Sequence, residues 1–121
     1  MKFCWVTINV RNMSESITFY EEIVGLAVMN QFTAGPDSEI SFLGAGETQV
    51  ELIHHTGGQE VMFGKDISIG FEVPSLDEMM TLLKEKGIEI KAGPIQPNPF
   101  MKFIFIEDPN GVRIQLVEHK K

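Results

Sequence analysis

The sequence predicts an α+β fold: two βαβββ modules in tandem, related by a pseudo-twofold axis. The order strand, helix, three strands occurs twice within 121 residues. The two copies also match in detail, since VELIHH at 50–55 corresponds to IQLVEH at 114–119. A supersecondary unit repeated at this spacing indicates a duplication, here read as one domain over residues 1–121. Any site on the repeated unit should therefore have a counterpart in the other copy.

The first module is expected to span residues 1–57. Its opening run, 3–10, alternates apolar and polar residues, which is typical of a strand. Asn12 with Glu15 resembles a helix N-cap, and Gly25 is a natural C-terminal stop, so a helix is predicted over 13–24. Three short apolar runs then predict strands near 26–33, 38–44 and 47–55.

A linker over 58–65 is expected to lead into the second module, 66–121. The same cycle follows there, with a strand at 66–73 and a helix at 75–86 that begins with the capping pair Ser75 and Glu78. Further strands are predicted near 88–92, 101–107 and 111–118. The segment 92–100 holds three prolines and is interpreted as a semi-rigid loop at the rim of a cavity, or equally as an ordinary connection.

Strand alternation separates a helix-covered face from an open face in each module. In the first strand Cys4, Val6 and Ile8 should face the helix, as should Ile67, Ile69 and Phe71 in the second module. The other face carries polar and aromatic groups, and two such faces could enclose a ligand cavity. A solvated sheet face would show the same alternation. The predicted cavity is lined by Trp5, Thr7, Asn9, Glu51, Ser68, Glu72, Phe105 and Gln115.

Composition restricts the partners. Seventeen acidic against ten basic residues give a net charge of −7, which argues against nucleic acid and membrane as partners. No apolar run approaches the length of a membrane span, and no signal peptide is recognisable, so a cytoplasmic protein is expected. The single cysteine, Cys4, excludes an internal disulfide and a thiolate metal cluster, and is expected to be a small core residue.

Two segments resemble the glyoxalase / bleomycin-resistance / dioxygenase superfamily, the vicinal oxygen chelate (VOC) fold. SITFYEEIVGLAV at 16–28 is similar to the family's S-x-x-F-Y segment, and FIEDPNGVRIQLVEH at 105–119 resembles its closing D-P-D/N-G-x-x-I-E-L motif. The turn Asp108-Pro109-Asn110-Gly111 also predicts, unaided, a connection between antiparallel strands. The resemblance covers essentially the whole chain and implies a homodimer, because the family commonly dimerises.

The resemblance also implies four metal-ligand positions, which fall here on Trp5, Glu51, Ser68 and Gln115. Glu51 and Gln115 are acceptable oxygen ligands, but an indole nitrogen only donates and a neutral serine binds metals poorly. His55 lies four residues beyond Glu51, roughly 13 Å along a strand, which is too far to share an ion. We therefore expect no cofactor and no bound divalent metal.

Three functions follow as hypotheses. The first is a metal-independent binding protein for a small molecule such as an antibiotic or metabolite, similar to the sequestering branch of the family. The second is a glyoxalase-like lyase or isomerase in which Glu51, partly desolvated beside Trp5, acts as general base. The third is a scaffold domain whose cavity has closed.

Overall fold

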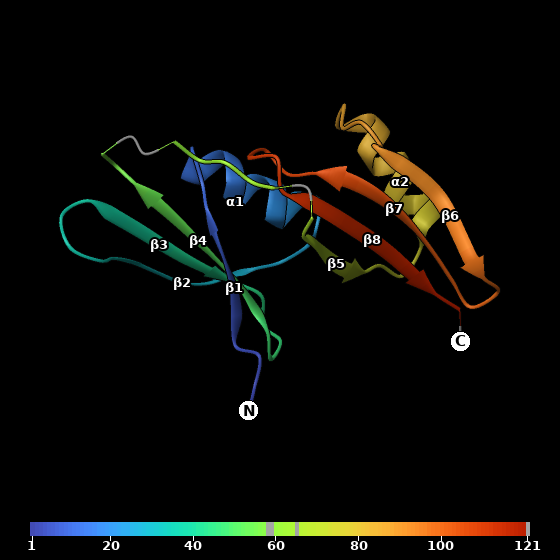
Figure 1. Cartoon of the computed structure of the whole chain (residues 1–121), viewed down its shortest axis with the longest axis horizontal. Helices are drawn as coiled ribbons and strands as arrows, with labels where there is room; N and C mark the ends of the chain where they lie inside the picture. The colour runs from blue at the N-terminus through green and yellow to red at the C-terminus, as the bar shows by residue number, and fades with distance from the viewer. Residues whose placement is uncertain (58–59, 65, 121) are drawn as a thin grey trace. The chain divides into compact units, whose positions relative to one another are not determined.

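In the computed structural model (Figure 1), residues 1–57, 60–64 and 66–120 are described. The chain divides into two compact units, Met1–Met62 and Phe63–Lys121. Each unit has the predicted order of strand, helix and three strands. Residues 58–59 and 65 of the expected linker, and residue 121 of the expected second module, lie outside the described residues.

The first unit is a four-stranded mixed sheet with one helix. Its elements are β1 (Trp5–Asn9), α1 (Met13–Glu22), β2 (Val28–Thr33), β3 (Ser38–Leu43) and β4 (Gln49–His55). The strand order is β1-β4-β3-β2, with β1 parallel to β4 and the other pairs antiparallel. The crossover through α1 makes the parallel β1–β4 pairing possible.

The second unit repeats this topology. Its elements are β5 (Ser68–Glu72), α2 (Leu76–Glu85), β6 (Ala92–Asn98), β7 (Met101–Glu107) and β8 (Arg113–His119). The order β5-β8-β7-β6 matches that of the first unit strand for strand, again with one parallel pair, β5 with β8. The predicted turn at 108–111 connects the antiparallel strands β7 and β8, and Asp108 Oδ1 accepts from the backbone of Asn110 and Val112 at 2.8 Å each.

The predicted helix boundaries rest on side-chain caps. Asn12 accepts from the backbone N–H of Glu15 at 3.0 Å, and Ser75 from that of Glu78 at 3.2 Å. Gly25 and Gly87, past the helix ends, have φ of 82° and 71°. This left-handed conformation lets the chain turn away from each helix at little steric cost.

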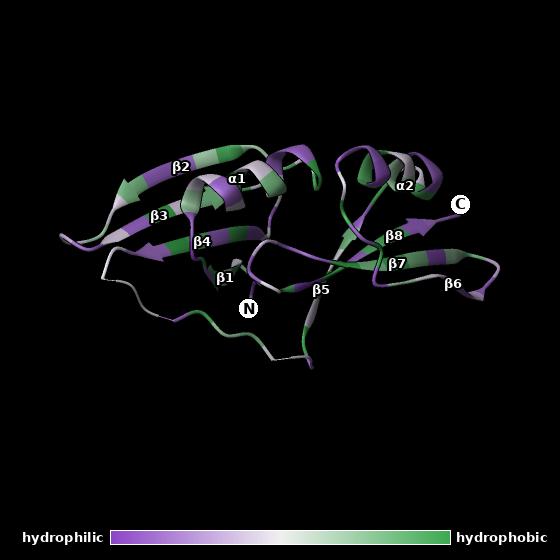
Figure 2. Cartoon of the chain, turned by 90° about the horizontal axis from the view of Figure 1, so that it is seen from above, coloured by the Kyte–Doolittle hydropathy of each residue, from purple (hydrophilic) through white to green (hydrophobic). Residues whose placement is uncertain are grey.

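Each unit buries an apolar face of its sheet against its own helix. Leu52 of β4 is fully buried in the first unit, as are Ile114 and Leu116 of β8 in the second. Hydrophilic and hydrophobic residues alternate in the first part of β4 (Figure 2), where Gln49 and Glu51 project from the face opposite to that of Val50 and Leu52. The candidate site lies on this other face, which the helix does not cover.

Three sequence-based expectations about the faces and edges are wrong. Cys4 lies before β1 and is exposed, and Ile67 lies before β5 and is exposed, because both strands begin two residues later than the predicted starts at residues 3 and 66. The segment 92–100 is not a loop, since 92–98 forms β6, and the strand expected near 88–92 begins at Ala92. Prolines fit in β6 because it lies at the sheet edge, where unmade ladder hydrogen bonds cost little.

The buried face of α1 is short. Its buried residues are Ser16, Phe19 and Tyr20, followed by Ile23 just beyond the helix.

Among the described residues, no helix combines the length and apolar character needed to cross a bilayer.

Candidate functional site

The open face of the first sheet places three side chains in one row across three strands. Thr7 of β1 pairs with Glu51 of β4, and Glu51 pairs with Phe42 of β3. Directly paired residues on neighbouring strands project from the same face of a sheet. Glu51 therefore lies between a hydroxyl and an aromatic ring.

An aromatic row runs over this face. The rings of Trp5 and Phe42 meet edge to face, with centroids 5.2 Å apart, and Phe42 stacks on Phe32 of β2 at 6.2 Å. We call Trp5, Phe42 and Phe32 the aromatic row. Trp5 is 49% exposed and Phe32 45% exposed, so the row offers aromatic surface to the solvent. Large aromatic side chains left exposed side by side are typical of binding surfaces.

Glu51 is buried, with 8% of its surface exposed. Its Oε1 accepts a hydrogen bond of 2.5 Å from the hydroxyl of Thr7. A buried carboxylate needs such a partner, because desolvation without compensation is costly. The polar group is thus fixed in place beside an apolar, aromatic surface.

The two adjacent histidines at the end of β4 point to opposite faces. His54 Nδ1 lies 3.4 Å from Glu39 Oε1, whereas His55 Nδ1 lies 3.1 Å from Ser38 Oγ. Glu39 and Ser38 are neighbours on β3, so their side chains also alternate. Each histidine therefore has a partner other than Glu51.

The second unit presents the corresponding face with different chemistry. Gln115 of β8 pairs with Gly70 of β5 and with Phe105 of β7. The guanidinium carbon of Arg113 lies 4.1 Å from the centroid of the Phe105 ring, which is cation–π geometry. By register, Gly70, Gln115 and Phe105 correspond to Thr7, Glu51 and Phe42 of the first unit.

The residues predicted for the cavity fall into two groups. Trp5, Thr7, Asn9 and Glu51 belong to β1 and β4 of the first unit, and Ser68, Glu72, Phe105 and Gln115 belong to β5, β7 and β8 of the second. Trp5, Thr7 and Glu51 are indeed brought to one open face. Glu72 Oε1 lies 2.8 Å from His119 Nδ1, and Ser68 is exposed opposite Arg113. A cavity that combines both groups stays a prediction.

Sequence reasoning missed Phe42 and Phe32. Alternation within 38–43 puts Phe42 on the same face as Ile40. The sequence does not show, however, that Phe42 pairs with Glu51, because this depends on the register between β3 and β4. Phe32 is placed by the pairing of β2 with β3, which has a register shift between Val28 and Asn30. That bulge is invisible in the sequence pattern.

The side chains at the four positions where the resemblance implies metal ligands do not fit a divalent ion. The indole of Trp5 offers no lone pair and its ring packs against Phe42, while Ser68 presents a neutral hydroxyl. One carboxylate oxygen of Glu51 already accepts a hydrogen bond from the Thr7 hydroxyl. Within the described part of the chain, no group of three or more His, Cys, Asp or Glu side chains could hold a metal ion. One carboxylate and one amide are a weak donor set for a transition metal.

Comparison with known proteins identifies the family to which this architecture belongs. The model of the Glyoxalase/Bleomycin resistance protein/Dioxygenase superfamily matches residues 2–116. The chain belongs to this superfamily. The resemblance drawn from 16–28 and 105–119 is thereby confirmed, and so is the fold of tandem VOC modules.

Individual relatives of this VOC protein differ in function. The lactoylglutathione lyase of Escherichia coli O157:H7 is 26% identical over 129 residues, covering 99% of this chain and 94% of the lyase. A glyoxalase family protein from Bacillus cereus superimposes with a TM-score of 0.87 at 20% identity, over 100% of this chain and 95% of that chain. TnmS3, an antibiotic binding protein from Streptomyces sp. CB03234, superimposes with a TM-score of 0.78 at 18% identity, over 99% and 97%.

Proposed function

We propose that this VOC protein binds a small organic molecule, an antibiotic or a metabolite, through an aromatic or flat apolar group laid on the aromatic row, and that it needs no metal ion to do so. The observation that carries the proposal is the row itself: Trp5, Phe42 and Phe32 in contact on an open sheet face, beside the buried Glu51. Aromatic side chains supply large contact area at low cost in side-chain entropy.

The electrostatics add a preference within that ligand class. Glu51 is the acidic group fixed beside the row, and the whole chain carries a net charge of −7. A ligand with a cationic group next to its ring would meet a carboxylate and an aromatic surface together. Antibiotic binding by TnmS3, which has the same fold, supports this class of ligand.

Metal independence is proposed from the donor set. An indole and a neutral hydroxyl stand at two of the four positions where the resemblance implies metal ligands, so only Glu51 and Gln115 would remain as donors to a divalent ion. We propose in addition that the protein acts in the cytoplasm as a homodimer, following the family resemblance.

The binding test uses a panel of aromatic antibiotics and metabolites, screened by thermal shift and followed by calorimetry on each compound that raises the melting temperature. Trp5→Ala should weaken such a ligand about ten- to hundredfold, since loss of an indole contact costs on the order of 1–3 kcal/mol. The matched control is Phe100→Ala, because Phe100 is an exposed aromatic residue of the second unit outside the row. Equal loss in both variants, or in neither, would contradict the proposal.

A lyase or isomerase reaction is the second candidate function. The observation that favours it is Glu51, a buried carboxylate at a family metal position in a chain whose curated relatives include lactoylglutathione lyases. In this reading a carboxylate oxygen of Glu51 takes a proton from a carbon acid of the substrate and returns it to a neighbouring atom.

Glu51→Gln separates the two functions because the amide keeps the size of the side chain but cannot accept the proton. If Glu51 is a base, turnover should be abolished while substrate binding changes little. If the protein only binds, no substrate should be turned over by the wild type. In that case Glu51→Gln should weaken a cationic ligand and spare a neutral one of the same shape.

A further inference from the structure

Arg113 of β8 is an exposed cation on the open face of the second sheet, and within the described residues it has no carboxylate partner. The residue directly across from it on β7 is an acid, Glu107, yet no ion pair joins the two side chains. Arg113 lies instead over the ring of Phe105, with its guanidinium carbon 4.1 Å from the ring centroid. The N–H groups of the guanidinium therefore remain available to an acceptor from outside the chain.

The acids nearest to this guanidinium have other partners. Glu107 Oε2 lies 3.7 Å from Lys91 Nζ. Its Oε1 lies toward the turn between β7 and β8, 3.9 Å from where a Cβ atom at Gly111 would lie. Glu72, the acid on β5, has its Oε1 at 2.8 Å from His119 Nδ1. The guanidinium is thus the charge on this face that an outside anion could neutralise.

Aromatic contacts hold the guanidinium in position. Phe105 lies beneath it, and Phe105 in turn meets Phe103 edge to face, with ring centroids 5.5 Å apart. A guanidinium over an aromatic ring is attracted by the ring while its N–H donors stay free. Since the side chain already has one orientation, less conformational entropy is lost when an anion binds.

Two neutral polar side chains lie beside the guanidinium. Ser68 pairs with Arg113 across β5 and β8, and Gln115 follows Arg113 on the same face of β8. Among the described residues, neither the Ser68 hydroxyl nor the Gln115 amide has a hydrogen-bond partner. The residue across from Gln115 is Gly70, so no side chain on β5 covers the amide. A hydroxyl and an amide can therefore donate to the same anion.

The open face becomes apolar on the far side of Phe105. Phe103 pairs there with Val117 of β8 and with Ile95 of β6. Phe103 is half-buried and Ile95 is 40% exposed, so both offer apolar surface to a ligand. Residues two apart on a strand are separated by roughly 7 Å. One small molecule can therefore reach from the guanidinium to this apolar surface.

The charges of the face favour a singly charged anion. A carboxylate matches two N–H groups of one guanidinium in a bidentate pair. A phosphate dianion would also meet the nearby carboxylates of Glu107 and Glu72, and no second unpaired cation compensates for them in the described part of this face. The apolar surface beyond Phe105 favours a ring on the same molecule.

We propose that the open face of the second sheet binds a small aromatic carboxylate. The carboxylate accepts hydrogen bonds from the guanidinium of Arg113, with Ser68 and Gln115 as further donors, and the aromatic ring lies on Phe103 and Ile95. The proposal rests on residues of the second unit alone. It therefore stands or fails separately from ligand binding at the aromatic row.

The test uses phenylacetate as the probe and follows the side-chain Nε–H signal of Arg113 by NMR of the isotope-labelled full chain. Phenylacetate should shift this signal saturably, with a dissociation constant on the order of 1 mM for so small a ligand. Phenethylamine has the same ring and the opposite charge, and it should leave the signal in place. Acetate lacks the ring and inorganic phosphate is the wrong anion, so each should bind about tenfold more weakly or worse.

Variants test the role of the guanidinium, with the backbone amide signals of Phe105 and Gln115 as reporters. Arg113→Gln should weaken phenylacetate binding about tenfold or more, because a charge-assisted hydrogen bond is lost. Arg113→Lys keeps the charge but lacks the planar fork, and should weaken binding about threefold or more.

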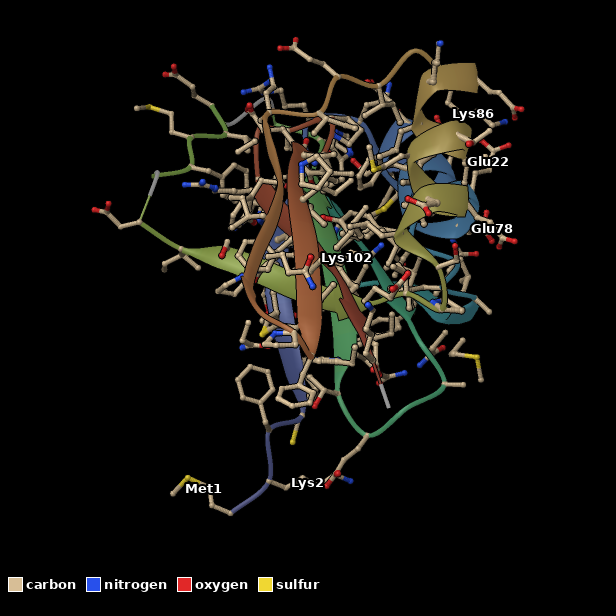
Figure 3. All side chains as sticks on the ribbon, turned by 90° about the vertical axis from the view of Figure 1, so that its right-hand side faces the viewer. Met1, Lys2, Glu22, Glu78, Lys86 and Lys102 are labelled. Carbon is tan, nitrogen blue, oxygen red and sulfur yellow. The ribbon has the colours of Figure 1, made fainter. Side chains whose placement is uncertain are left out.

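Lys102→Gln is the matched control, because it removes the same charge from the neighbouring strand. Lys102 lies on β7 (Figure 3), and its Nζ is 3.8 Å from Oε2 of Glu118, whose other oxygen accepts from the backbone of Leu76 at the start of α2. The pair thus belongs to the helix-covered face. Lys102→Gln should leave the dissociation constant within about twofold of the wild type.

Several outcomes would overturn the proposal. The first is that phenylacetate does not shift the Arg113 signal. The second is that binding survives Arg113→Gln, or weakens as much in Lys102→Gln. The third is that phosphate or phenethylamine shifts the Arg113 signal as strongly as phenylacetate, since the face would then not select an aromatic carboxylate.

Discussion

Trp5 and Glu51 show how single residues set the chemistry of this VOC protein. Trp5 stands where the family resemblance implies a metal ligand, and its ring lies edge to face on Phe42, at 5.2 Å between centroids. Glu51 keeps a potential ligand but directs one oxygen to Thr7. In this chain the two positions contribute to an aromatic surface with a carboxylate beside it.

The hydrogen bond between Thr7 and Glu51 yields a prediction at the residue scale. Thr7→Val keeps the shape of the side chain but removes the hydroxyl donor, so the buried Glu51 carboxylate loses a partner. We expect the free energy of unfolding to fall by about 1 kcal/mol, measured by chemical denaturation. Thr18→Val is the control, because Thr18 lies exposed on α1. Equal effects of the two substitutions would show that the bond contributes nothing.

Alternation along a strand predicts the sheet face on which an individual residue lies. Alternation along β1 and β4 correctly puts Thr7 and Glu51 on one face, because both strands are regular and pair without a bulge. It misplaces Cys4, because alternation does not say where a strand begins. Phe32 could not be assigned, since its neighbours across the sheet depend on the irregular register of β2.

At the scale of elements, helices were predictable because their ends carry local signals. The caps at Asn12 and Ser75 and the glycines at 25 and 87 act within a few residues of chain, so sequence alone contains them. β6 was missed because its prolines resemble those of a loop. Its strand character comes from pairing with β7, a tertiary contact that local pattern does not report.

Gly93 in β6 gives a prediction at this scale. Its φ is +102°, and a Cβ atom built there would lie 2.8 Å from the carbonyl oxygen of Phe103 on the neighbouring strand. Gly93→Ala should therefore lower the free energy of unfolding by about 2–4 kcal/mol, through backbone strain and a clash with backbone atoms.

Gly46→Ala is the matched control, because a Cβ at Gly46 would meet nothing within 4 Å and its φ lies outside the left-handed region. We expect its effect to stay within about 0.5 kcal/mol. Similar melting temperatures for the two variants would mean that β6 does not approach β7 as closely as described.

At the scale of the whole molecule, the two units share one topology but carry different side chains on the open faces of their sheets. Thr7, Glu51 and Phe42 correspond by register to Gly70, Gln115 and Phe105, so the carboxylate and the hydroxyl occur only in the first copy of these three positions. The duplicated fold was predictable because hydrophobic periodicity survives divergence. The ligand was not, since fold alone does not determine function.

Trp5 is the single tryptophan of the chain, and this makes the central claim directly measurable. Protein stripped of metal with a chelator is titrated with the tightest ligand of the aromatic panel while Trp5 emission is recorded, and the titration is repeated with added Ni²⁺, Zn²⁺, Fe²⁺ or Mn²⁺. We predict a saturable change in Trp5 emission, with the same dissociation constant in chelator and in each metal. Binding or turnover that appears only after metal is added, or a ligand that binds without changing Trp5 emission, would contradict the account.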